Sequence, residues 1–234
     1  MRGHFALAAG IAFACVSSAS LAADIPTGVA VPVAPPIGER FYVSFHGGYT
    51  FGNKSHDVAY DTIAPPGLTF VVESTSKSGW RVGGAAGKNL GDYFSIEAEV
   101  AYARADASAA TVVVPAPGGP FPVTGSGSLL TGMINAFLGS NIGAIRPYIG
   151  GGAGVGYFTA HNITGASAVL NGSTTGLAAQ AMAGIDFAVT DSMTIGGRYR
   201  YLYVTDLSLM DGGYKHDFNL TSQSVEIVLT NSFN

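Results

Sequence analysis

Two pairs of like-charged residues in the sequence are spaced at i and i+2, namely Glu97 with Glu99 and Arg198 with Arg200. Neighbouring carboxylates can act as general acid and general base when their surroundings separate their pKa values. In a β-strand, however, this spacing places both side chains on one face, where arginines can neutralise the carboxylates. We therefore interpret these residues as structural ion pairs, with a role in ion transport as the alternative.

Other catalytic patterns are weak. Residues 54–57 place Lys, Ser, His and Asp side by side, but adjacent residues in a connector do not form a catalytic triad. Residues 211–217 are polar without the spacing of a calcium loop. The single cysteine, Cys15, lies in the predicted export signal. The sequence thus predicts a protein that is not an enzyme and has no cofactor or metal site.

The composition narrows the class of protein. Of 234 residues, 47% are hydrophobic and only 11% are charged, whereas soluble domains carry roughly 25% charged residues. This balance excludes intrinsic disorder, which requires low hydrophobicity and high net charge. A net charge of -4, from 11 Lys and Arg against 15 Asp and Glu, argues against a nucleic-acid partner.

The N-terminus has the features of an export signal. Residues 1–22 combine a short positive start, an apolar stretch and small residues before the cleavage point, which we place after Ala22 or Ala23. Residues 23–39 are rich in proline and read as an extended periplasmic tail. We assign residues 40–234 to one outer-membrane domain.

From residue 41 onward, eight runs alternate apolar and polar side chains with period 2. One clear run sets Phe94, Ile96 and Val100 against Glu97 and Glu99. Such alternation is typical of strands between two unlike environments. Short turns near residues 88–92, 141–145 and 190–192 alternate with long connectors near residues 53–75, 105–127, 160–175 and 206–219. The prediction is an all-β, eight-stranded antiparallel transmembrane β-barrel with short periplasmic turns and four long extracellular loops.

The polar faces of these runs carry too few charges for a surface exposed to water. A soluble lipocalin-type barrel is the alternative, but we expect the apolar face to meet lipid and the polar face to line the lumen. Alternating glycines at 150, 152, 154 and 156 would relieve crowding on one face of a strand. The expected lumenal polar network, structural or selectivity-determining, consists of His46, Arg81, Glu97, Glu99, Asp186, Arg198, Arg200 and Glu226.

Several motifs resemble the small porin-like outer-membrane β-barrel proteins of Gram-negative bacteria, a family known mostly as surface antigens. They are residues 41–49 (FYVSFHGGY), residues 146–157 (RPYIGGGAGVGY) and residues 192–202 (SMTIGGRYRYL). The resemblance implies the cell outer membrane as the location. It also implies Phe233 as the C-terminal signal for the outer-membrane assembly machinery, although Asn234 follows it here.

The resulting expectation is an integral outer-membrane protein that contributes to envelope integrity and presents its loops outside. Its expected partners are outer-membrane lipid, lipopolysaccharide and the assembly machinery. A narrow porin-like channel for ions or small solutes is the alternative, because eight strands leave an interior that side chains can fill. Binding of haem or a host ligand by the loops is the weakest alternative.

Overall fold

The computed structural model describes residues 39–52, 54–61, 69–114, 118–164, 169–211 and 214–233. The predicted signal peptide, and all but the last residue of the predicted tail, lie outside these residues. Within the described ranges, no helix has the length and apolar character needed to cross a membrane.

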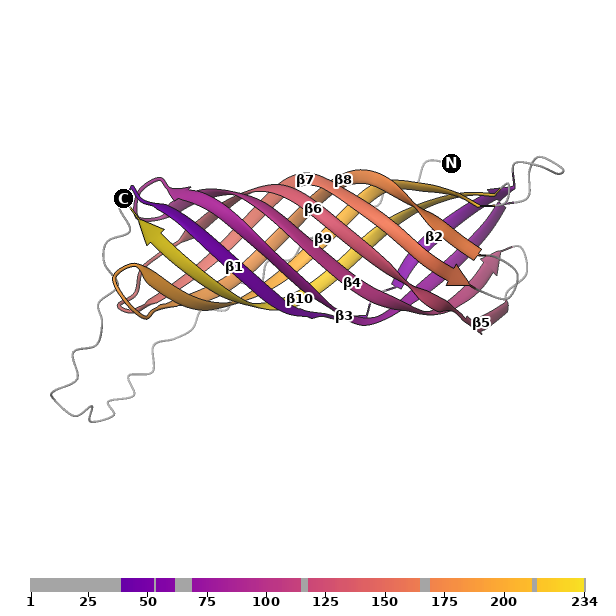
Figure 1. The fold of residues 1–234 in the computed structure, drawn as a ribbon, viewed down its shortest axis with the longest axis horizontal. Coiled ribbons are helices and arrows are strands. Elements are labelled where there is room, and N and C mark those ends of the chain that lie inside the picture. Colours follow the sequence, from indigo (N-terminus) through magenta and orange to yellow (C-terminus); the bar gives the residue numbers. More distant parts are fainter. Residues whose placement is uncertain are drawn as a thin grey trace, which may run out of the picture. The chain divides into compact units, whose positions relative to one another are not determined.

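The described chain consists of β-strands that form one closed antiparallel sheet (Figure 1). In chain order the strands are β1 (Phe41–Thr50), β2 (Lys54–Asp61), β3 (Thr69–Asn89), β4 (Phe94–Val114), β5 (Gly118–Pro122), β6 (Thr124–Gly139), β7 (Ile145–Thr164), β8 (Val169–Ala188), β9 (Met193–Asp211) and β10 (Tyr214–Phe233).

Ten strands make a ring of eight because two positions in the wall are each filled by two strands. β1 and β2 both pair with β3 and with β10, at successive heights. β5 and β6 both pair with β4 at successive heights, and β6 also pairs with β7. The remaining strands pair with their neighbours in sequence, which confirms the predicted eight-stranded antiparallel barrel.

The four long connectors differ in extent from the prediction. Most of their residues continue the strands, so that β3 and β4 each run for 21 residues and β7, β8 and β10 for 20. Transmembrane strands need only about 9–11 residues. The strands therefore extend well past the membrane as hairpins, because backbone pairing continues where side-chain alternation has faded.

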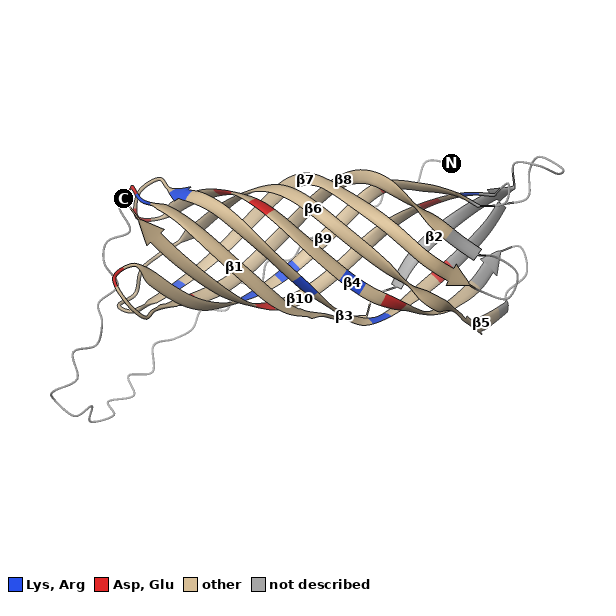
Figure 2. Ribbon diagram, in the orientation of Figure 1, with Lys and Arg blue, Asp and Glu red and all other residues tan. Residues whose placement is uncertain are grey.

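A belt of exposed apolar side chains surrounds the half of the barrel nearest the short turns. Its outward residues alternate with buried ones, as in β10, where Val225, Ile227 and Leu229 are exposed and Glu226 and Val228 are buried. Charged residues are few along the ribbon (Figure 2). Exposed aromatic side chains lie at the two edges of the belt: Phe41, Tyr93, Phe94, Phe187 and Phe233 near the turns, and Phe51, Trp80, Tyr157 and Tyr203 at the other edge. This pattern is that of a lipid-facing surface with two aromatic girdles.

The first and last strands close the barrel. β1 pairs with β10 over its whole length, from Phe41 opposite Phe233 to Thr50 opposite Ser224. The rings of Phe41 and Phe233 stack with their centroids 6.5 Å apart. Closure satisfies the backbone groups that would otherwise be unpaired in lipid. The short turns, the start of β1 and the end of β10 lie at the same end of the barrel. In outer-membrane barrels this end faces the periplasm.

Candidate functional site

Six charged side chains meet in the lumen, and we call them the lumenal ion network. They are three arginines and three glutamates contributed by β3, β4, β9 and β10: Arg81, Glu97, Glu99, Arg198, Arg200 and Glu226. Each belongs to the inward-facing set of its strand and each is at most 6% exposed. Because a buried charge is costly unless it is paired and hydrogen-bonded, the contacts among them decide what the lumen can do.

Arg200 lies at the centre of the network. Its Nη1 and Nη2 donate to the two carboxylate oxygens of Glu99 at 2.8 and 3.1 Å. Its Nε and Nη2 donate to those of Glu226 at 2.9 and 3.1 Å. Nη1 also donates to Gln180 Oε1. One guanidinium thus joins a carboxylate of β4 to a carboxylate of β10 across the lumen, using the forked geometry that only arginine offers.

Arg81 reinforces the same two carboxylates from β3. Its Nη2 donates to Glu99 Oε1 at 3.0 Å and to Thr131 Oγ1 at 3.1 Å, and its Nε lies 3.5 Å from Glu226 Oε1. Ser224 Oγ donates a further hydrogen bond to Glu226 at 2.9 Å. Both carboxylates therefore have several partners, so breaking one contact leaves others in place.

Arg198 and Glu97 extend the network toward the periplasmic end. Arg198 Nε donates to Glu226 Oε2 at 3.1 Å, and its Nη1 lies 4.0 Å from Glu97 Oε1. Asn135 Nδ2 donates to both Glu97 and Glu99 at 3.0 Å, while Tyr42 OH donates to Glu97 at 3.2 Å. Neutral side chains thus bridge the charged ones.

The two other predicted lumenal residues lie beside the network. His46 is buried, with Nε2 3.9 Å from Glu99 Oε1, and neither ring nitrogen has a hydrogen-bond partner among the described residues. Asp186 lies closer to the periplasmic mouth, opposite Arg146 in the β7–β8 pairing, and its Oδ1 likewise has no hydrogen-bond partner in the described part of the chain. The structure therefore brings six of the eight predicted residues into one network of ion pairs. The role of that network stays a prediction.

Inward-facing glycines provide the space for this network. A Cβ atom on Gly152 of β7 would collide with Asn135 Oδ1, and one on Gly83 of β3 would collide with the imidazole of His46. The side chains of neighbouring strands fill the volume that these glycines leave. The alternating glycines of β7 thus serve close packing across a narrow lumen.

A second layer of the interior is apolar and lies directly beyond the network, toward the extracellular end. On β9, Leu202 and Val204 follow Arg200 on the inward face. We call this cluster the apolar layer: Leu129, Met133, Phe158, Ala160, Ala178, Leu202, Val204, Leu207 and Leu209. Phe218 packs against it, with its ring 5.4 Å from that of Phe158. The lumen is thus filled by ion pairs at one height and by hydrocarbon at the next.

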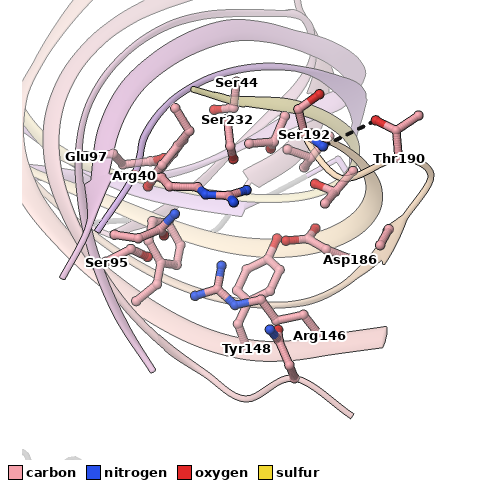
Figure 3. A pocket seen from close by; sticks show the side chains of 18 of the residues that line it. Arg40, Ser44, Ser95, Glu97, Arg146, Tyr148, Asp186, Thr190, Ser192 and Ser232 are labelled. Carbon is pink, nitrogen blue, oxygen red and sulfur yellow. Dashed lines mark hydrogen bonds between the residues drawn. The ribbon is translucent and has the colours of Figure 1, made fainter. Parts of the chain in front are cut away.

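The periplasmic mouth remains hollow, as a cavity of about 110 Å³ below the network (Figure 3). Arg146, Tyr148 and Asp186 lie on one side of it. Arg40 donates a hydrogen bond across the rim to the Asp191 carbonyl at 3.2 Å. Nε and Nη2 of Arg146 are buried and have no hydrogen-bond partner within the described ranges. Charged and apolar side chains both line the cavity, which ends at Glu97 and Arg198 of the network.

Sequence reasoning missed two features of this interior. The first is Arg146, which precedes a proline in a glycine-rich segment without clear alternation. The second is the apolar layer, because apolar residues had been assigned to the lipid face. A signal for the layer exists in β9, where Tyr201 and Tyr203 face outward while Leu202 and Val204, which alternate with them, are also apolar. Apolar residues on both faces indicate a strand that is buried on the inside as well.

The described residues hold no group of three or more His, Cys, Asp or Glu side chains arranged to bind a metal ion. On the outer surface, Ser128 Oγ and His161 Nε2 lie 3.0 Å apart, as a nucleophile and its base would. Within the described ranges, no hydrogen bond or ion pair joins His161 to the carboxylate that would orient such a base. The described residues are arranged for ion pairing and packing inside the barrel and for binding at its surface.

A closed, lipid-belted ring of eight strands with a filled lumen defines a small integral outer-membrane barrel. The sequence matches the model of the outer membrane protein beta-barrel domain over residues 6–223, and the chain belongs to this family. This confirms the predicted class and its location in the outer membrane. The family consists mostly of barrels without enzymatic activity.

Several solved structures are similar to this chain. The outer membrane protein OprG from Pseudomonas aeruginosa aligns with a TM-score of 0.53 at 16% identity, covering 84% of this chain and 97% of OprG. Neisserial surface protein A aligns with a TM-score of 0.41 at 16% identity, covering 80% of this chain and 95% of that protein. Ail of Yersinia pestis aligns with a TM-score of 0.36 at 12% identity, covering 81% of this chain and 97% of Ail. A search of curated protein sequences finds no match.

Proposed function

We propose that this protein is a closed, non-enzymatic barrel that stabilises the outer membrane and presents its long hairpins outside the cell. The observation that supports closure is the succession of two filled layers in one lumen. A hydrated ion would have to displace the contacts of Arg200 with Glu99 and Glu226 and then cross the apolar layer. Apolar constrictions block ions because water leaves them.

Lipid and lipopolysaccharide are the partners that the apolar belt supports, since they are what surrounds such a belt in the outer membrane. We propose that the assembly machinery is the third partner, acting through the terminal strand. Phe233 lies on the outward face of β10 and is 49% exposed, so its ring is accessible for recognition before the strands close.

A narrow channel is the second candidate, and the periplasmic cavity favours it. That cavity already reaches from the periplasmic mouth to Glu97. Only the network and the apolar layer would have to open. Under this hypothesis, changes to the network alone would change the permeability.

A flux assay separates the two functions. The mature protein is refolded into lipid vesicles, and potassium efflux is compared among four proteins. They are the wild type, a network variant (Glu97→Gln with Glu99→Gln), an apolar-layer variant (Leu202→Ser) and the combination of all three changes. The closed barrel predicts background efflux for the wild type and for the network variant, because the apolar layer still blocks the lumen, and measurable efflux for the combination.

Efflux through the wild-type barrel, or through the network variant with the apolar layer intact, would contradict closure and favour the channel. Folding of each variant is checked by the shift in gel mobility between heated and unheated samples. Cells that lack the protein should also admit more of a large apolar dye. Re-expression of the combined variant should restore that barrier less well than the wild type.

A further inference from the structure

The strands β4, β6 and β7 are adjacent in the barrel wall (Figure 1). Along all three, the outward-facing residues change from apolar to polar at one height. The apolar belt ends there at Tyr102, Leu130 and Tyr157. The register between these strands is regular across this height. The next outward-facing residues form what we call the outer-face cluster: Arg104 and Asp106 of β4, Ser126 and Ser128 of β6, and Thr159 and His161 of β7.

Two hydrogen bonds hold the cluster against the barrel wall. Arg104 Nη2 donates to Ser126 Oγ at 3.0 Å, and Ser128 Oγ lies 3.0 Å from His161 Nε2. The serines are only 5% and 7% exposed although they face outward, because Arg104 and His161 lie across them and remain exposed themselves. The guanidinium is therefore oriented in advance, and it carries further donors besides the one that Ser126 accepts.

The charges on this side of the barrel favour an anion. Lys77 is exposed in the bulge of β3 that lies opposite Asp106 in the β3–β4 pairing. Lys77 and Arg104 thus bring two fixed positive charges to a surface with one carboxylate. On the opposite side, the first outward residues beyond the belt on β8, β9 and β10 are uncharged, namely Thr175, Thr205 and Gln223, and the exposed carboxylate Asp206 follows in the bulge of β9.

We propose that the outer-face cluster binds a phosphate group of a glycolipid in the outer leaflet, with Arg104 as the principal ligand. Arg104 is two residues beyond the last belt residue of β4, roughly 7 Å along the strand. That is the level of lipid headgroups, just outside the hydrocarbon and next to the aromatic girdle. Guanidinium groups bind phosphate through paired, charge-assisted hydrogen bonds. Asp106 opposes the bound phosphate and limits the affinity.

This inference rests on the location of the barrel in the outer membrane and not on closure of its lumen. The flux assay can therefore fail while the lipid site stands, and the converse also holds.

Binding is measured with the refolded mature protein in detergent micelles, using bisphosphorylated lipid A as the probe and dephosphorylated lipid A for comparison. Arg104→Gln should weaken binding of the phosphorylated probe about tenfold, the range expected for a lost charge-assisted hydrogen bond. Asp106→Asn should strengthen it about two- to threefold, because a like charge is removed. Lys88→Gln, which removes a cation at the periplasmic edge beside Phe41, is the matched control and should bind as the wild type does.

The proposal is overturned if Arg104→Gln and Asp106→Asn both bind like the wild type, or if Lys88→Gln weakens binding as much as Arg104→Gln does. Equal binding of phosphorylated and dephosphorylated probes also overturns it. Displacement of the lipid by inorganic phosphate at millimolar concentration would show a site for the free ion and overturn the lipid assignment. If Arg104→Gln does not fold, Asp106→Asn retains the opposite and equally specific expectation.

Discussion

The lumenal ion network and the apolar layer lie next to each other in the same barrel, and they differ in what each side chain needs from its neighbours. Arg200 needs Glu99, Glu226 and Gln180 at specific positions, because a buried charge without partners is strongly unfavourable. Leu202, two residues along the same strand, needs only contact with other apolar groups. Ion pairs therefore make the lumen specific and vulnerable to single changes, whereas the apolar layer closes it with more tolerance.

The largest effect is expected when the network loses its centre. Arg200→Met should lower the free energy of unfolding by about 3–5 kcal/mol, because Glu99 and Glu226 keep their burial and lose their main cation. Urea unfolding in lipid vesicles, followed by tryptophan fluorescence, measures this. A loss below about 1 kcal/mol would mean that the network is hydrated and that the contrast with the apolar layer does not hold.

A substitution in the apolar layer should lower the free energy of unfolding somewhat less than Arg200→Met does. Leu202→Ala should lower the free energy of unfolding by roughly 2–4 kcal/mol, through lost burial and the cavity that remains. The same unfolding experiment applies, with Leu130→Ala on the lipid face as the control. The control should cost less, because lipid refills the vacated space. Equal losses for the two leucines would show that position 202 is not packed.

Replacing a cation and an anion of the network together tests how far the two side chains depend on each other. The double variant Arg200→Met with Glu99→Met leaves Arg81, Arg198, Glu97 and Glu226, so the charges stay balanced. It should therefore be less destabilised than the sum of the single changes, by about 1–3 kcal/mol. A double-mutant cycle measures this coupling. Simple additivity would mean that the two side chains do not depend on each other.

The smallest effect is expected for an ion pair outside the membrane. Lys215 Nζ donates to Asp217 at 2.8 Å on the extracellular part of β10, where both side chains are exposed. This hydrogen bond lowers the pKa of Asp217, so its contribution to stability is present at neutral pH and is lost as the pH falls through that lowered pKa. Lys215→Gln should raise the Asp217 pKa, as followed by NMR titration.

Because this pair is exposed to water, the same substitution should change the free energy of unfolding by less than about 1 kcal/mol. A cost as large as that of Arg200→Met would contradict the link between burial and the energy of an ion pair.

Most of the barrel could be predicted from the sequence, because lipid and lumen impose opposite polarity on alternate residues. Glu97 and Glu99 lie on one face of β4 and Ile96 and Ala98 on the other, and this alternation already defines the two faces. The pairing of Arg200 with Glu99 and Glu226 could not be predicted, since it depends on shear between strands that are distant in sequence. The hairpins beyond the membrane were also missed, since water on both faces removes the alternation there.

The outer-face cluster shows a further limit of reading one strand at a time. Arg104 and His161 are 57 positions apart in the chain, with Ser128 between them. The three residues come together only through the register of β4, β6 and β7. Each strand alone shows only where its apolar belt ends. The site can be recognised only when the three strands are aligned at the residues where the apolar belt ends.

Closure of the lumen is the central claim, and single-channel recording tests it most directly. The folded wild-type protein is inserted into a planar bilayer in 1 M KCl, and current is recorded at both polarities. The two-layer lumen predicts a silent membrane, while the variant that combines Glu97→Gln, Glu99→Gln and Leu202→Ser produces discrete steps. Stable, reproducible steps from the wild type, from protein shown to be folded, would contradict closure and identify the barrel as a narrow channel.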